Sequence, residues 1–207
     1  RAHWLEVGCG TGALTQTILQ RADPASVLAC DPSPAFVSFA RGSIADRSVE
    51  FLVASAEDLP RRNGGFDVIV SGLVLNCIPQ PSDAVRWMRE RLRPGGELAA
   101  YVWDYDEGMQ FLRIFWDEVV ARDPSAAPLD ERRRFPICQP EALMRLFEQA
   151  GLDAVETRAL QIDTLFPDFA TYWAPFQGGA GPGPSSVASL DPGAHRGLRT
   201  RFEQRLA

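Results

Sequence analysis

The chain has 207 residues, 45% of them apolar, and carries 27 acidic against 21 basic side chains for a formal net charge of −6. Because long-range repulsion opposes a polyanion, this balance argues against a nucleic acid as the main ligand. No apolar run approaches the roughly 20 residues that cross a bilayer, so we expect a soluble protein with no membrane partner.

Cysteine and histidine are too scattered to suggest a disulfide framework or a zinc site. His3 and His195 stand far apart, and no two cysteines form a Cys-x-x-Cys pair. We therefore expect no metal, reduced thiols and a cytoplasmic location. No basic leader precedes an apolar run at the start of the chain, so no secretory signal is expected. The basic run at 132–134 is expected to be a solvated loop or helix end.

From residue 1 to about residue 103, short apolar runs alternate with helical stretches, the pattern of a parallel sheet covered by helices. The predicted strands are residues 4–7, 27–30, 49–53, 66–71 and 96–103. The predicted helices are residues 12–21, 34–41 and 83–92, the last capped by Ser82 or Asp83. We predict an α/β fold with a Rossmann-like, doubly wound, mostly parallel sheet.

The second half of the chain is expected to be mainly helical. Residues 110–122 and 140–150 have helical spacing, and residues 154–162 are predicted as a sixth strand. The glycine-, proline- and serine-rich segment 177–192 is predicted as a flexible loop, followed by a helix over 195–206. At this length, one domain over residues 1–207 is the expectation.

A glycine-rich loop carries the strongest functional signal. The first strand runs into Gly8, Gly10 and Gly12, where positive φ angles and helix N-terminal amides would let a ligand lie against the backbone. Asp31 follows the second strand about 20 residues after Gly10, where an acid binds ribose hydroxyls. Because Gly8, Gly10 and Ala13 also satisfy the dinucleotide fingerprint, NAD(P) and FAD stay open as cofactors.

Four segments together resemble the class I methyltransferases that depend on S-adenosylmethionine (SAM), in particular the type 11 small-molecule methyltransferases. Glu6-x-Gly8-x-Gly10-x-Gly12 resembles the family's first motif. Residues 54–60 resemble its adenine-binding segment, residues 66–71 its fourth-strand motif, and residues 92–96 its turn into strand five. The four segments lie in the family's order and spacing, and they span about half of the chain.

The resemblance implies roles for individual residues. Glu6 would order the glycine loop and help to receive the methionine ammonium group, and Asp31 would bind both ribose hydroxyls. A carboxylate complements the charges of SAM but repels a pyrophosphate, so Glu6 is the best discriminator between the cofactors. Phe36 is expected in the core rather than on the adenine. The full set of cofactor-binding candidates is Glu6, Gly8, Cys9, Gly10, Gly12, Asp31, Pro32, Ser55, Ala56, Glu57 and Ser71.

The implied function is transfer of a methyl group from SAM to a small-molecule acceptor by in-line displacement, with S-adenosylhomocysteine as product. Alignment and exclusion of water can carry this reaction without a strong base. Asn76, Asp104 and Tyr105 are the catalytic candidates, because they follow strands at the carboxyl edge of the sheet. Asn76 cannot accept a proton, so a histidine-base mechanism is not expected. Residues 104–176 would form a helical insertion on the acceptor side, where most aromatic side chains are expected to pack in the core and one or two to line an acceptor pocket.

Several alternatives stay open at this point. The protein could be an NAD(P)- or FAD-binding oxidoreductase, or a SAM-binding module without transfer activity. The sequence leaves open the acceptor, the target atom (oxygen, nitrogen, carbon or sulfur), and whether the protein is a monomer or a homodimer. The family fold has seven strands and helices ahead of strand one. We expect this chain to lack those helices and the seventh strand, with flanking segments missing.

Overall fold

A computed structural model describes residues 1–178 and 181–206, which group into two compact units. The first unit comprises Arg1–Val102 and Leu143–Glu156, and the second comprises Trp103–Ala142 and the residues from Thr157 onward. The second unit thus contains most of the expected 104–176 insertion, and a single domain over residues 1–207 stays a prediction. Within the described residues, no helix is both long and apolar enough to span a bilayer.

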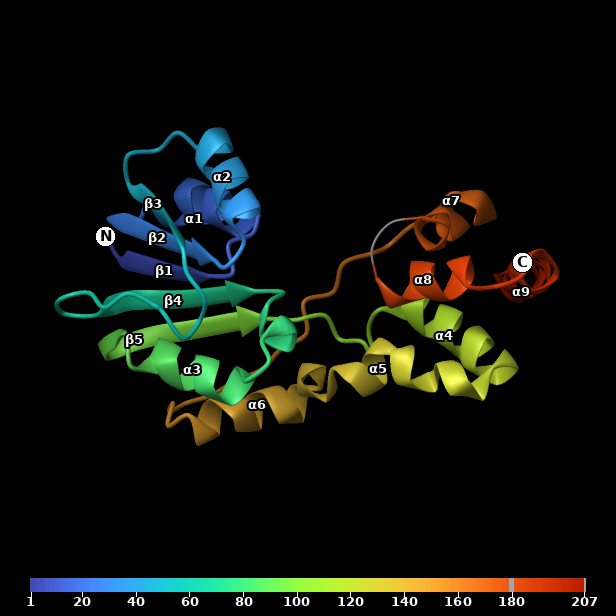
Figure 1. The fold of residues 1–207 in the computed structure, drawn as a ribbon. Coiled ribbons are helices and arrows are strands. Elements are labelled where there is room, and N and C mark those ends of the chain that lie inside the picture. Colours follow the sequence, from blue (N-terminus) through green and yellow to red (C-terminus); the bar gives the residue numbers. More distant parts are fainter. Residues whose placement is uncertain (179–180, 207) are drawn as a thin grey trace. The chain divides into compact units, whose positions relative to one another are not determined.

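The first unit is built on a parallel sheet of five strands, which confirms the predicted Rossmann-like α/β fold. The strand order is β3-β2-β1-β4-β5, and the order reverses between β1 and β4 (Figure 1). Ligands of such sheets bind at this reversal, beyond the carboxyl ends of the strands. The strands are β1 (His3–Val7), β2 (Ser26–Asp31), β3 (Val49–Val53), β4 (Phe66–Gly72) and β5 (Leu92–Tyr101).

Helices cover both faces of this sheet. Helices α1 (Ala13–Ala22) and α2 (Pro34–Ser43) lie on one face, and α3 (Pro81–Arg89) and α6 (Pro140–Gln149) lie on the other (Figure 1). Ile18 of α1 and Val37 of α2 are buried against β2 and β3. The burial of strands on both faces explains why their sequences are almost continuously apolar.

Helix α3 and strand β5 differ most from the prediction in this unit. Helix α3 begins at Pro81 with Gln80 as its N-cap, and Asp83 pairs with Arg86 at 2.8 Å instead of capping the helix. Strand β5 begins at Leu92 rather than at residue 96. The residues that were expected to form a turn before the strand instead lie within it, where its pairing with residues 66–68 of β4 is irregular. Between these pairs β5 holds three more residues than β4, and as in a β-bulge the strand continues past them.

The second unit is helical and packs around aromatic side chains. Its elements are α4 (Gln110–Arg122), η2 (Pro124–Leu129), α5 (Glu131–Arg134), η3 (Pro136–Cys138), α7 (Phe169–Trp173), η4 (Ala174–Phe176), α8 (Pro182–Ala188) and α9 (Pro192–Leu206). Phe115 of α4 and Phe176 of η4 stack with ring centroids 4.2 Å apart, and both are buried. The bounds of α4 agree with the predicted helix.

The predicted sixth strand at residues 154–162 is wrong. Ala154 adopts a φ of 53°, and the segment has no strand geometry. Leu160 and Ile162 are 72% and 70% exposed. Their alternation resembled a strand, but a strand is stabilised only by pairing and burial, and no described residues pair with this segment.

The predicted loop at residues 177–192 contains helix α8. Val187 is buried in the aromatic core. A Cβ at Gly183 would already be in van der Waals contact with the rings of Phe115 and Phe176. Burial of a small, tightly packed face outweighs the poor helix propensity of this composition. Residues 179–180 of the predicted loop lie outside the described residues, and α9 begins three residues before the predicted 195.

Candidate functional site

The glycine loop turns sharply at the carboxyl end of β1 and is bound to the end of β2. Gly8, Gly10 and Gly12 all have positive φ angles, of 80°, 52° and 92°. The amides of Gly8 and Cys9 donate to the Cys30 carbonyl at 2.7 and 2.9 Å, and the Gly10 amide donates to Asp31 Oδ2 at 2.9 Å. Most of the loop's amides are therefore used within the protein.

The three glycines differ in what surrounds them. A Cβ at Gly8 would lie 2.3 Å from Val74 Cγ2, and one at Gly12 would lie 2.7 Å from Ile44 Cδ1. A Cβ at Gly10 would meet no described atom within 4 Å. Gly8 and Gly12 are needed for packing, whereas Gly10 leaves its side of the loop open for a ligand.

This difference predicts opposite outcomes for two alanine substitutions. Gly8→Ala should destabilise the fold by about 2 kcal/mol or more, because the methyl group collides with Val74 and the left-handed backbone is strained. Gly10→Ala should cost only about 1 kcal/mol of strain but should weaken binding of S-adenosylhomocysteine at least about tenfold. Urea unfolding and calorimetry would measure the two effects. Recovery of stability in Gly8→Ala/Val74→Ala is the control, and equal stability of the two single variants would contradict the assignment.

Asp31 joins the glycine loop to the turn after β2. Its Oδ1 accepts from the Ser33 amide at 2.8 Å while Oδ2 accepts from Gly10, and the residue is 8% exposed. A carboxylate offers about four acceptor positions, so two remain for further donors. The Asp31 carbonyl also accepts from the Ala54 amide at 3.1 Å, which brings the 54–60 segment beside it.

Glu6 lies beneath the loop rather than on its open side. It is 1% exposed, and the Thr15 hydroxyl in the first turns of α1 donates to its Oε2 at 2.5 Å. Burial raises the pKa of Glu6 to about 7, opposed by hydrogen bonds from the Thr15 side chain and backbone and reinforced by the charge of Asp31. The Glu6 carboxyl group thus joins the end of β1 to α1, and its role in ordering the loop stays a prediction. The role of Thr15 was not predicted from the sequence.

The remaining candidates near β1 are structural in this arrangement. Burial raises the pKa of both Cys9 and Cys30 to about 12, so their thiols stay protonated and are poor nucleophiles. The Ser71 hydroxyl donates to the Val7 carbonyl at 3.0 Å, which ties β4 to β1. Ser71 is 1% exposed and positions the backbone at the strand ends.

The expected adenine segment is a turn on the surface. The Ser55 hydroxyl donates to Asp58 Oδ2 at 3.0 Å, while Ala56 is half-buried and Glu57 is exposed. Pro32 is exposed as well. Phe36 is 50% exposed, so the expectation that it belongs to the core is wrong. Its position on the first turn of α2 directs it away from the sheet, toward the surface after Asp31.

A second group of residues at this edge was not predicted. The backbone after β4 turns at Leu73, which adopts an uncommon φ of 59° and donates its amide to the Tyr101 carbonyl at 2.8 Å. This turn places Val74 against Gly8. The ring of Tyr101 lies over Gly72, where a Cβ would be 2.4 Å from the phenolic oxygen. These contacts join segments far apart in the sequence, so no local motif predicts them.

The three catalytic candidates belong to different units. Asn76 lies half-buried in η1 (Leu75–Cys77) of the first unit. Asp104 and Tyr105 lie in the second, where Asp104 Oδ1 accepts from the Asp106 and Glu107 amides and caps a turn. The Tyr105 ring packs against Phe135 at 5.6 Å. These contacts are structural and do not test the catalytic roles of Asn76, Asp104 and Tyr105, which stay predictions.

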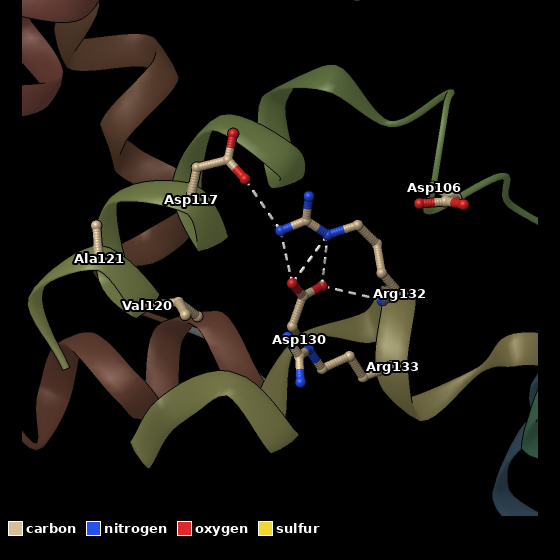
Figure 2. Close-up of a pocket in the computed structure, with 7 residues that line it drawn as sticks. All are labelled: Asp106, Asp117, Val120, Ala121, Asp130, Arg132 and Arg133. Carbon is tan, nitrogen blue, oxygen red and sulfur yellow. Dashed lines mark hydrogen bonds and ion pairs between the residues drawn. The ribbon is translucent and has the colours of Figure 1, made fainter. Parts of the chain in front are cut away.

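The second unit holds a cavity of about 560 Å³ next to the basic run. Figure 2 shows the Arg132 guanidinium between the carboxylates of Asp117 and Asp130, at 3.1 and 2.6 Å. Arg132 is thereby neutralised, so the run is not a uniformly basic surface.

A second cavity, of about 360 Å³, is lined by Asp67 and Arg93 at the amino edge of the sheet. Neither cavity includes the glycine loop or Asp31. No cluster of potential metal ligands occurs within the described ranges.

The aromatic residues expected around an acceptor pocket are mostly core. Tyr172, Trp173 and Phe176 are at most 4% exposed inside the second unit. Trp103, at 37%, is more accessible.

Comparisons with known proteins match the first half of the chain to methyltransferases. Residues 5–100 match the sequence model of a family described as a methyltransferase domain. Over 107 residues the chain is 36% identical to a thiol S-methyltransferase of Homo sapiens, covering 49% of this chain and 41% of that protein. It is 32% identical over 124 residues to a ubiquinone biosynthesis O-methyltransferase of Xanthomonas oryzae, covering 58% and 51%. The chain spans about half the length of these relatives.

A solved structure shares the fold of the whole chain. It is a protein of an antibiotic biosynthesis pathway in Anabaena variabilis, described as a methyltransferase, with a TM-score of 0.66 at 15% identity. The match covers 99% of this chain and 79% of that one. At such low identity the likeness concerns the fold alone.

Proposed function

We propose that the protein transfers a methyl group from SAM to a small organic acceptor, because residues 5–100 of this chain belong to the class I SAM-dependent methyltransferase family. The choice of cofactor rests on the hydrogen bonds that the amides of the glycine loop already make. A dinucleotide needs free amides at the start of α1 for its pyrophosphate. Here the amides of Gly8, Cys9 and Gly10, just ahead of that helix, donate within the protein, and the carboxylate of Glu6 accepts from the Thr15 hydroxyl in its first turn.

The charge at this edge supports the same choice. Glu6 and Asp31 are both acidic, and the negative charge of Asp31 helps to raise the pKa of Glu6. Two carboxylates beneath and beside the loop attract a cationic ligand and repel a pyrophosphate. We assign binding of the ribose hydroxyls to Asp31 and binding of the adenine to Ala56 and Glu57. The ligand would approach the backbone most closely on the open side of Gly10.

Bound SAM would supply an electrophilic methyl group on a positively charged sulfur. The work of the chain's own residues would be alignment and exclusion of water, which can contribute on the order of 7 to 11 kcal/mol. A general base is not required for an acceptor that is already nucleophilic. The relatives named above are an S- and an O-methyltransferase, which favours a small-molecule acceptor with a thiol or hydroxyl group.

Incubation of the protein with SAM labelled in the methyl group and pools of small thiols and phenols tests the function. We expect mass spectrometry to find an acceptor that gains one methylene mass, with release of S-adenosylhomocysteine. The matched control is Asp31→Ala, which should abolish the transfer. Binding of SAM without transfer to any acceptor would favour a binding module instead of an enzyme.

A further inference from the structure

Tyr101 places a phenol on the same face of the sheet as Glu6. Glu6 pairs in register with Val70, and two residues further along β4 Gly72 pairs with Tyr101. Because side chains alternate along a strand and register partners share a face, Glu6 and Tyr101 point to the same side. The strand order β1-β4-β5 puts β4 between them.

The ring of Tyr101 reaches back across β4 toward Glu6. A Cβ at Gly72 would lie 2.4 Å from its phenolic oxygen and 2.5 Å from Cζ, so the hydroxyl end of the ring occupies the space above that glycine. Tyr101 is 41% exposed. Across residues 1–178 and 181–206, nothing hydrogen-bonds to this hydroxyl, which leaves it available to a ligand.

The hydroxyl acts as a hydrogen-bond donor at neutral pH. Partial burial, followed by the negative charge of Glu6, raises the pKa of the Tyr101 phenol above its ordinary value, so the proton stays on the oxygen. The cations on and before β5 lie at the opposite end of that strand. Arg91 donates to the Leu59 carbonyl, and Arg93 donates to Asp67.

The methionine end of SAM needs such a donor. It carries an ammonium group and a carboxylate on one carbon, and the negative charge of Glu6 favours the first but opposes the second. The amides of Gly8, Cys9 and Gly10 are already used within the protein. A neutral donor beside Glu6 therefore complements the carboxylate at little electrostatic cost.

We propose that the Tyr101 hydroxyl donates a hydrogen bond to the carboxylate at the amino-acid end of bound SAM, beside the ammonium group that Glu6 favours. This inference rests on the proposed function and adds a cofactor-binding residue to it. Tyr101 lies outside every motif by which the sequence resembles its family. Its role depends on the β4–β5 register and on the absence of a side chain at Gly72.

Two ligands separate this role from a general effect on the site. S-adenosylhomocysteine has the amino-acid end, whereas 5′-methylthioadenosine has the same nucleoside without it. Tyr101→Phe should weaken S-adenosylhomocysteine about tenfold by calorimetry, the loss expected for a hydrogen bond to a charged group, and should leave 5′-methylthioadenosine unchanged within about twofold. Gly72→Ala, which displaces the ring, should give the same selective loss.

Tyr172→Phe is the matched control, because it removes a phenolic hydroxyl that donates to the Phe111 carbonyl in the other unit. The ratio of the two affinities should not change in this variant. Equal losses for both ligands in Tyr101→Phe, or an unchanged affinity for S-adenosylhomocysteine, would overturn the proposal while the proposed function stands. A wild-type protein that binds neither ligand would instead overturn both.

Discussion

Asp31→Ala is expected to weaken S-adenosylhomocysteine binding by at least about 100-fold. The substitution removes the proposed acceptor of two ribose hydroxyls, and each charge-assisted hydrogen bond would contribute ~1.5 kcal/mol or more. It also leaves the Gly10 amide without its 2.9 Å acceptor, so the loop loses one of its attachments to β2. Calorimetric titration of the purified variant measures the change.

Two other variants test whether the loss comes from the ligand contact. Asp31→Asn keeps the shape but loses the charge, so its affinity should fall between those of wild type and Asp31→Ala. Asp46→Ala removes an aspartate that accepts from the Ser48 amide at 2.8 Å, the same local turn as Asp31 with Ser33 but ahead of β3. It should bind like wild type. An Asp31→Ala affinity within threefold of wild type would contradict the assigned role of Asp31.

Glu6→Gln is expected to stabilise the fold at alkaline pH and to weaken the binding of SAM. The folded protein raises the pKa of Glu6 from 4.5 to about 7, so the folded state holds a proton that the unfolded chain releases between these values. The ionised carboxylate is penalised by burial, and wild-type stability falls as pH rises from 4.5 to 7. The accumulated penalty above pH 7 is about 3 kcal/mol.

Urea unfolding of both proteins across pH measures this penalty. The stability of Glu6→Gln relative to wild type should increase by about 2 kcal/mol between about pH 5.5 and about pH 8, since glutamine can still accept from Thr15 but never ionises. SAM binding to wild type near pH 7 should release a proton from Glu6, detectable by calorimetry in buffers of different ionisation enthalpy. A pH-independent stability difference would show that Glu6 ionises normally.

The sequence was most informative where a single pattern determines local structure. The bounds of β3 and α4 agree with the prediction, and β1, β2 and β4 differ from it by about a residue at either end. A strand buried on both faces is apolar throughout, and Pro124 marks the end of α4. The glycine loop and Asp31 were found for the same reason, because a motif with fixed spacing encodes their geometry.

The remaining features depend on contacts between distant segments. The buried carboxylate of Glu6 is bonded to Thr15, nine residues away, and the ring of Tyr101 occupies the space left by Gly72 on a neighbouring strand. The exposed Leu160 and the buried Val187 show that alternation and composition alone misassign segments whose packing decides their structure. Such contacts follow from the fold and have no signature in the local sequence.

Calorimetry with S-adenosylhomocysteine and NADH, titrated separately into one preparation of the chain, tests most directly whether the acidic glycine loop selects a sulfonium nucleoside. We predict saturable binding of S-adenosylhomocysteine in the micromolar range and no measurable heat from NADH. Tight binding of NADH, with no measurable heat from S-adenosylhomocysteine under the same conditions, would mean that the loop binds a pyrophosphate instead.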